Sequence, residues 1–306
     1  MARDPRQLVG EAGWVTVPEL LAHVSRSTLR NWVAAGKLVR LRPGVLALPG
    51  VAADWRTRLA AALLGREAVA SHVTALALWE LTQHPPGPVH ISVDPRSSGR
   101  GPAGVVVHRA TGAWTDRRRV QGSAVSSAEK AVLDAWAITA PPAIAAIRAA
   151  AITGVRRRIC SARELRHELS RNTSLRGRAE LSRLVDLLAD GCQSELEIWG
   201  CLHVLRAPGM PRFVQQRRVA VGAETFVLDA ACEESMLAVE MDGAAWHGSR
   251  AQRERDIRRD ALLATVGWQT LRFSFARLTR SPEACRHEIV AVHTARLRLL
   301  RGGTVR

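Results

Sequence analysis

Long apolar runs are absent from this sequence of 306 residues. A membrane-spanning helix needs about 20 consecutive, mainly apolar residues, so an integral membrane protein is excluded. No stretch pairs a basic face with a Trp/Phe/Leu face, which makes a membrane surface a poor partner. The first residues, MARDPRQLVGEAGW, lack the apolar core of a secretory signal peptide. We therefore expect a cytoplasmic protein with no membrane partner.

Cysteine is scarce, and its spacing is irregular. The five cysteines lie at positions 160, 192, 201, 232 and 285. None of them forms a C-x-x-C pair, and an odd number does not suit a complete disulfide framework. The pattern is typical of reduced intracellular thiols rather than of disulfides or a zinc finger.

Acidic residues are too few to balance the basic ones. The chain has 28 acidic against 44 basic residues and a formal net charge of +16. A surplus of this size favours a polyanionic partner, because basic side chains bind phosphates and release counterions. Double-stranded DNA is the partner we expect, although an arginine-rich composition also arises in GC-rich genomes. The chain is long enough for two or three domains.

The segment Trp14–Pro49 has the pattern of a winged helix-turn-helix. Short helices are predicted at Val17–Leu21 and at Arg26–Ala34, the second capped by Ser25. Two strands, Leu38–Leu41 and Val45–Leu48, then form the wing. The second helix places Leu29 and Trp32 toward the core. Its polar residues are predicted to contact DNA: Ser27, Thr28, Arg30 and Asn31. A protein-docking module would show the same pattern.

The middle segment alternates between strand and helix patterns. Strands are predicted at Val89–Val93 and Val105–His108, and helices at Ser127–Thr139, Pro142–Thr153, Ala162–Leu169 and Arg178–Leu188. His72 begins an apolar helix, where a structural histidine is more common than a catalytic one. These elements predict an α+β domain.

The front part of the chain resembles a known family. The segments GKLVRLRPGVLALPG, SHVTALALWEL, VHISVD, GVVVHR and SSAEKAVLDAWA are similar to AbiEi-type antitoxins of abortive-infection systems, over roughly residues 10–140. The resemblance implies a transcriptional regulator and makes a toxin protein a further candidate partner.

Carboxylates follow two apolar runs in the C-terminal third. Thr225–Leu228 and Met236–Val239 read as the strands of a hairpin, and acids follow each of them. Alternate side chains of a strand share a face, so Glu240 and Asp242 point the same way, and Asp229 joins them if it lies on that face. Three converging carboxylates are unfavourable without a cation, and all-oxygen ligands suit Mg²⁺ or Mn²⁺. The alternative to a metal site is an ordinary hairpin turn with solvent-exposed carboxylates.

A helix and a third strand follow the acids. The helix is predicted at Ala251–Thr265, and the strand at Gln269–Phe275, with Leu271, Phe273 and Phe275 on one face. Arginines crowd the first turns of the helix, where their guanidinium groups suit the phosphates of a nucleic acid. These arginines are Arg250, Arg253, Arg255, Arg258 and Arg259.

The stretch VEMDGAAWHG, followed by RD, L, GW and LRFS, resembles the very-short-patch-repair (Vsr) endonucleases, a branch of the PD-(D/E)xK superfamily. The resemblance covers roughly residues 194–292. It implies catalytic roles for Glu197 (with Glu195 as the alternative), Asp229, Glu240, Asp242 and His247. The superfamily's usual lysine is replaced by Asp242, as in the Vsr branch, and only Lys37 and Lys130 occur in the chain. Either His247 and a metal-bound water move the protons, or the site is degenerate.

These patterns predict a multi-domain α/β protein with three parts. They are a winged helix-turn-helix at 1–50, an α+β antitoxin-like domain at 51–190, and a restriction-endonuclease-like domain at 191–306 with a mixed sheet flanked by helices. The predicted function is Mg²⁺- or Mn²⁺-dependent phosphodiester hydrolysis, with Asp229, Glu240 and Asp242 as metal ligands. The alternative is a DNA-binding regulator with an inactive nuclease fold. The oligomeric state stays open.

Overall fold

The computed structural model describes residues 4–97, 101–242 and 250–302, apart from the side chains of 250–252. It divides into two compact units, Met1–Ala179 and Glu180–Arg306. None of the helices in these ranges is long and apolar enough to cross a bilayer. The finer division at residues 50 and 190 remains a prediction.

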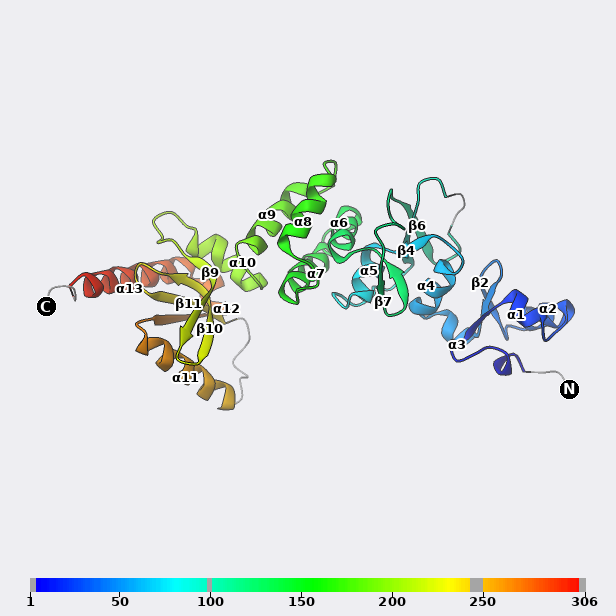
Figure 1. Ribbon diagram of the computed structural model, residues 1–306, viewed down its shortest axis with the longest axis horizontal. Helices are drawn as coiled ribbons and strands as arrows, with labels where there is room; N and C mark the ends of the chain where they lie inside the picture. Colours follow the sequence, from blue (N-terminus) through cyan, green and yellow to red (C-terminus); the bar gives the residue numbers. More distant parts are fainter. Residues whose placement is uncertain (1–3, 98–100, 243–249, 303–306) are drawn as a thin grey trace. The chain divides into compact units, whose positions relative to one another are not determined.

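The first unit begins with a small sheet and its helices (Figure 1). Its elements are a 3₁₀ turn Pro5–Gln7, β1 Trp14–Thr16, α1 Val17–Leu21, α2 Arg26–Ala34, β2 Val39–Arg42, β3 Val45–Ala47 and α3 Pro49–Ala52. The strand order is β1-β3-β2, with both neighbours antiparallel to β3. Both predicted helices and the hairpin are confirmed, whereas β1 was not predicted.

Local sequence explains where these helices begin. Thr16 and Glu19 form a capping box at α1, and Ser25 accepts a hydrogen bond from the Thr28 amide at α2. Trp32 is buried in a core with Leu20 and other apolar side chains. The predicted inward face of α2 is therefore confirmed.

The rest of the first unit is a five-stranded sheet with helices. The elements are α4 Trp55–Leu63, β4 Ala68–Ala70, α5 His72–Leu78, β5 Val89–Val93, β6 Val105–Arg109, β7 Arg118–Val120, β8 Ser123–Val125, α6 Ala128–Ile138, α7 Ile144–Arg156 and α8 Ala162–Arg171. The strand order is β6-β5-β4-β8-β7. The strands predicted in this segment are confirmed, and the helices are confirmed with small differences at their ends.

The second unit is built on a four-stranded sheet of order β12-β11-β10-β9. Its elements are α9 Arg178–Ala189, which begins at the junction, α10 Glu195–Gly200, a π-helical turn Cys201–Leu205, β9 Val214–Val221, β10 Glu224–Cys232, β11 Leu237–Asp242, α11 Arg250–Thr265, β12 Gln269–Ser274, α12 Phe275–Arg280 and α13 Pro282–Gly302. The predicted hairpin is confirmed as antiparallel β10 and β11. Strand β12 runs parallel to β11, so the connection through α11 crosses over.

Helices cover both faces of this sheet (Figure 1). On one face, side chains of α10, α12 and α13 pack with Val239, Met241 and Phe273. On the other, Leu263 of α11 packs with Ala238 and Trp268. The prediction for Phe275 is wrong, because it begins α12 and is 57% exposed. The mixed sheet flanked by helices is the predicted α/β fold.

Candidate functional site

The acids of β11 lie where the strand alternates between its two faces. Val239 and Met241 pack on the α10 and α13 side, whereas Ala238 packs on the α11 side. Glu240 therefore faces α11. It is only 4% exposed, while the Asp242 side chain at the strand end is 53% exposed. The two carboxylates share a face but differ in their access to solvent.

The sequence had suggested that Asp229 follows the end of its strand, whereas the structure places it inside β10. The register pairs Ala230 with Val239, which brings Asp229 opposite Glu240. One Asp229 carboxylate oxygen accepts a hydrogen bond from the Met241 amide at 2.9 Å. That bond fixes the carboxylate beside β11.

Glu197 reaches the same region from α10. Ser194 caps this helix, and the Glu197 carboxylate accepts hydrogen bonds from the Gln193 amide (2.9 Å) and the Gln216 side chain (3.2 Å). Helix α10 packs closely on β11 at Gly200, where a Cβ would lie 2.4 Å from Met241 Sδ. Glycine thus permits the close approach that holds Glu197 near the sheet.

The pKa values show that these acids affect one another. Burial, and then the charge of Asp229, raises the pKa of Glu240 to about 7. Burial also raises the pKa of Asp229, and Asp242 adds to the effect. The pKa of Glu197 is raised by burial and, more weakly, by Asp229. Close carboxylates in a partly desolvated site are typical of metal-binding and catalytic centres.

Arginines supply the positive charge beside the acids. Arg259 of α11 forks onto Glu240, with Nη–Oε distances of 2.7 and 3.0 Å, and also donates to the Val227 carbonyl. Arg272 of β12 binds Asp260 through two nitrogens and lies 3.7 Å from Asp242. The two guanidinium groups thus offset part of the negative charge.

The predicted phosphate-binding arginines of α11 differ in their surroundings. Arg258 pairs with Glu224 in an exposed ion pair, and Arg259 is used inside the domain. Arg253 and Arg255 are exposed. His247 and the Arg250 side chain lie outside the described residues.

The predicted DNA-contacting face of α2 is exposed for most of its length. Ser27, Arg30 and Asn31 are exposed, and Thr28 is half-buried, with its hydroxyl 2.9 Å from that of Ser25. Lys37 and Arg40, which follow in the turn and in β2, are exposed as well. This surface is basic and polar, as a phosphate-binding surface requires.

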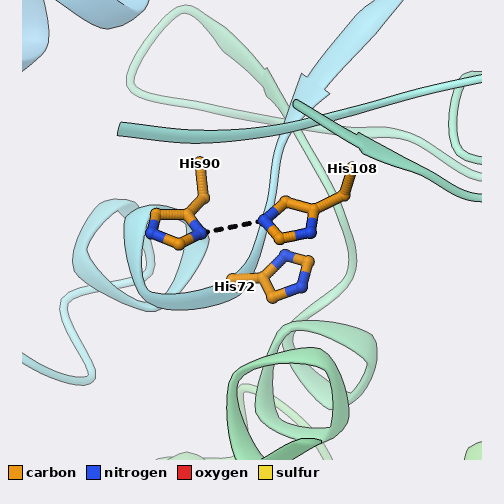
Figure 2. A group of neighbouring side chains, drawn as sticks. All are labelled: His72, His90 and His108. Atoms are coloured by element: carbon orange, nitrogen blue, oxygen red, sulfur yellow. Dashed lines mark hydrogen bonds between the residues drawn. The ribbon is translucent and has the colours of Figure 1, made fainter. Parts of the chain in front are cut away.

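A group of three histidines was missed by the sequence reading. His72, His90 and His108 bring one ring nitrogen each within 4.8 Å of one another, and no other group of three metal-ligating side chains does so in the described part of the chain. Figure 2 shows the rings side by side, with a hydrogen bond of 2.9 Å between His90 and His108. The available signal in the sequence was one histidine in each of two predicted strands, His90 and His108, at even-numbered positions.

The first unit has a basic helical face, and the second has buried acids at a sheet. These features define a protein with a regulator-like part and a nuclease-like part. Comparison with known families agrees. The AbiEi_4 family model, described as transcriptional regulator, AbiEi antitoxin, matches residues 3–49. The REase_MTES_1575 model matches residues 209–292. The chain therefore carries an AbiEi antitoxin-type regulator domain at its N-terminus and a restriction-endonuclease-like domain at its C-terminus. The narrower Vsr assignment remains a prediction.

A search of the curated proteins finds no match. Among solved structures, the crystal structure of the RV2827C protein from Mycobacterium tuberculosis is similar at 20% identity, covering 60% of this chain and 75% of that one, with a TM-score of 0.40.

Proposed function

We propose that the protein binds double-stranded DNA through its regulator domain and hydrolyses phosphodiester bonds through its restriction-endonuclease-like domain. The observation that carries the proposal is the meeting of two buried acids, Glu197 and Glu240, with the half-buried Asp229 between them in electrostatic effect. Glu197 comes from α10, Asp229 from β10 and Glu240 from β11, and Asp229 affects the pKa of both others. A fold alone would not support an activity, whereas a site of this kind does.

Asp229 and Glu240 are the pair that suits a hard divalent cation, whereas the oxygens of Asp229, Glu240 and Asp242 do not all lie within 4.8 Å of one another in the described part of the chain. Asp229 and Glu240 offer only oxygen atoms, which Mg²⁺ and Mn²⁺ prefer, and Asp242 is close enough to raise the pKa of Asp229. A bound ion would polarise the scissile phosphate and acidify an attacking water. The Met241 amide already orients Asp229, and Gln193 and Gln216 orient Glu197. Arg259 would have to release Glu240 for both oxygens to reach an ion.

Proton transfer in this proposal is assigned to the chain's own groups. Glu240 has a pKa of about 7 in the metal-free fold, so it would give up its proton when it becomes a ligand of the cation. His247 is the candidate general base, and it lies outside the described residues. Arg253 and Arg255, both exposed on α11, are proposed to contact the flanking backbone.

The test is incubation of the full chain with duplex and single-stranded DNA, in Mg²⁺ or Mn²⁺ against EDTA. We expect cleavage that needs the metal and disappears in Asp229→Asn and in Glu240→Gln. The exposed acid Glu233 provides the matched control, and Glu233→Gln should cleave normally. Cleavage that persists in both site variants would refute the proposed site.

One observation favours a second function, that of a DNA-binding regulator with an inactive nuclease fold. Arg259 occupies both oxygens of Glu240 in this structure, as a permanent internal counterion would. In that case the protein would bind DNA in a salt-dependent way, without cleaving it in any divalent ion. A toxin that co-purifies with the chain from its native host would point further to the antitoxin role.

A further inference from the structure

The histidine group lies in the first unit, far along the sequence from the acidic site. The topology brings its members together. Strands β5 and β6 are parallel, with His90 opposite Val106, so that His108, two residues on, shares the face of His90. The Ser71 amide donates to the His90 carbonyl, which places His72 beside the same strand.

The three rings form one packed, partly desolvated group. His72 is 5% exposed, and its ring stacks on His108 with centroids 3.6 Å apart. The ring of His90 lies 5.1 Å from that of His108 and 5.5 Å from that of His72. Nδ1 of His90 and Nε2 of His108 face each other at 2.9 Å, so one hydrogen is shared between two basic nitrogens.

Two further observations indicate more than a packed core histidine. His72 has a φ of +52°, a left-handed backbone that is uncommon outside glycine and is found preferentially at functional positions. Its Nδ1 lies 3.0 Å from the Ser71 hydroxyl. With Nδ1–H donating to this hydroxyl, the lone pair of Nε2 is left for a metal, and the hydrogen bond would orient the bound imidazole.

We propose that His72, His90 and His108 bind one divalent transition-metal ion, with Zn²⁺ as the first candidate. Imidazole nitrogens suit Zn²⁺, Co²⁺, Ni²⁺ and Cu²⁺ and disfavour Mg²⁺. Tetrahedral Zn–N bonds of about 2.0–2.1 Å place ligand nitrogens roughly 3.3 Å apart. The nitrogens here are already within 4.8 Å of one another, so a bound ion would have to draw them closer and turn the rings that now stack. Three protein ligands leave the fourth position to water.

Burial supports the ligand role. It lowers the pKa of His72 to about 2 and, together with His108, that of His90 to about 4, so both rings are neutral with a free lone pair at pH 7. On metal binding the proton shared by His90 and His108 would move to the outer ring nitrogen of its own histidine, so that both imidazoles stay neutral. The positive charge of Lys130 also lowers the pKa of His72. The Lys130 ammonium is paired with Asp134 at 3.1 Å and lies 4.0 Å from Glu168.

The experiment titrates Zn²⁺ and Co²⁺ into the chelator-treated full chain and follows Co²⁺ absorption and the heat of Zn²⁺ binding. With Mg²⁺ in excess to fill the proposed acidic site, we expect one Zn²⁺ or Co²⁺ ion per chain. Each of His72→Asn, His90→Asn and His108→Asn should weaken binding by more than about 10-fold, a loss that even outer-shell changes cause. His84→Asn, a half-buried histidine of the same unit stacked on Trp55, is the matched control.

X-ray absorption of the Zn²⁺-loaded wild-type protein keeps the test decisive if a variant misfolds. Three imidazole ligands would support the site. A spectrum dominated by sulfur or carboxylate ligands, or no stoichiometric binding, would overturn it. The site does not depend on the proposed nuclease, so binding should be unchanged in Asp229→Asn.

Discussion

The pair between Arg259 and Glu240 gives the sharpest test of the acidic site. Glu240 is 4% exposed and is held by both guanidinium nitrogens. Arg259→Gln would leave this carboxylate buried without its counterion. Breaking a buried pair in this way costs about 3–5 kcal/mol, because the remaining charge is uncompensated. Here the loss is smaller, because Glu240 can take up a proton instead of remaining charged: it is about 1.4 kcal/mol at pH 8, one pH unit above the wild-type pKa of about 7.

The effect should depend on pH in a defined direction. The pKa of Glu240 is about 7 in the folded chain, above its ordinary value of 4.5. A raised carboxyl pKa destabilises the fold, and this loss is absent below about pH 4.5 and complete only above the folded pKa. Arg259→Gln raises the folded pKa further. The difference between variant and wild type should therefore be small at pH 6 and large at pH 8.

Hydrogen exchange of the β10 and β11 amides measures this difference in the full chain, and the ratio of variant to wild type cancels the intrinsic pH dependence of exchange. A loss of about 1.4 kcal/mol corresponds to roughly 10-fold faster exchange where protection reflects the opening equilibrium. The control is Arg258→Gln on the same helix, whose pair with Glu224 is 63% and 42% exposed. It should change stability by less than about 1 kcal/mol.

Two outcomes would refute this reasoning. One is an equal effect of Arg258→Gln and Arg259→Gln, which would mean that burial does not decide the strength of the pair. The other is a loss for Arg259→Gln that is the same at pH 6 and pH 8. In a Glu240→Gln background the loss from Arg259→Gln should shrink, because no buried charge is left without a partner.

Four further predictions follow from the structure. Because the pKa of His72 is lowered, the unfolded chain takes up a proton below about pH 6.5 while the folded chain does not. In urea unfolding, the metal-free protein should therefore lose about 2 kcal/mol of stability from this group between pH 7 and pH 5. The variant His72→Asn should remove most of that loss. Arg30→Ala should lower the slope of log binding constant against log salt by about 1 in DNA titrations, and an unchanged slope would exclude a phosphate contact. Phe273→Ala removes a fully buried ring and should cost about 3–5 kcal/mol, measured by exchange of β12 amides. Gly200→Ala should cost about 1–3 kcal/mol and reduce metal-dependent cleavage, because its Cβ would push α10 away from Met241.

Periodicity and capping explain why so much local structure was predictable. Helix α2 follows from a Ser25 cap and an apolar face that ends near Gly36, and the hairpin of β10 and β11 follows from two apolar runs around a polar turn. Phe275 was placed wrongly because Ser274 caps a new helix where strand alternation seemed to continue. Strand β9 went unpredicted.

The site was only partly predictable. The sequence pointed to Asp229, Glu240 and Asp242 because acids follow two strand patterns. It did not reveal that Glu240 is buried and forked by Arg259, since that contact joins residues 19 apart through the packing of a helix on the sheet. Nor did it show that Arg259, expected to hold phosphate, serves an internal carboxylate.

The sequence by itself determined the α/β class, the basic charge and the kinds of side chain available to each domain, because these depend on composition and on short-range spacing. Only the tertiary structure decided which of those side chains meet. The register of β5 with β6 gathered His72, His90 and His108, and the pairing of β10 with β11 set Asp229 opposite Glu240. Burial, which fixes the charge of both groups, arises from that packing and cannot be obtained from any single segment.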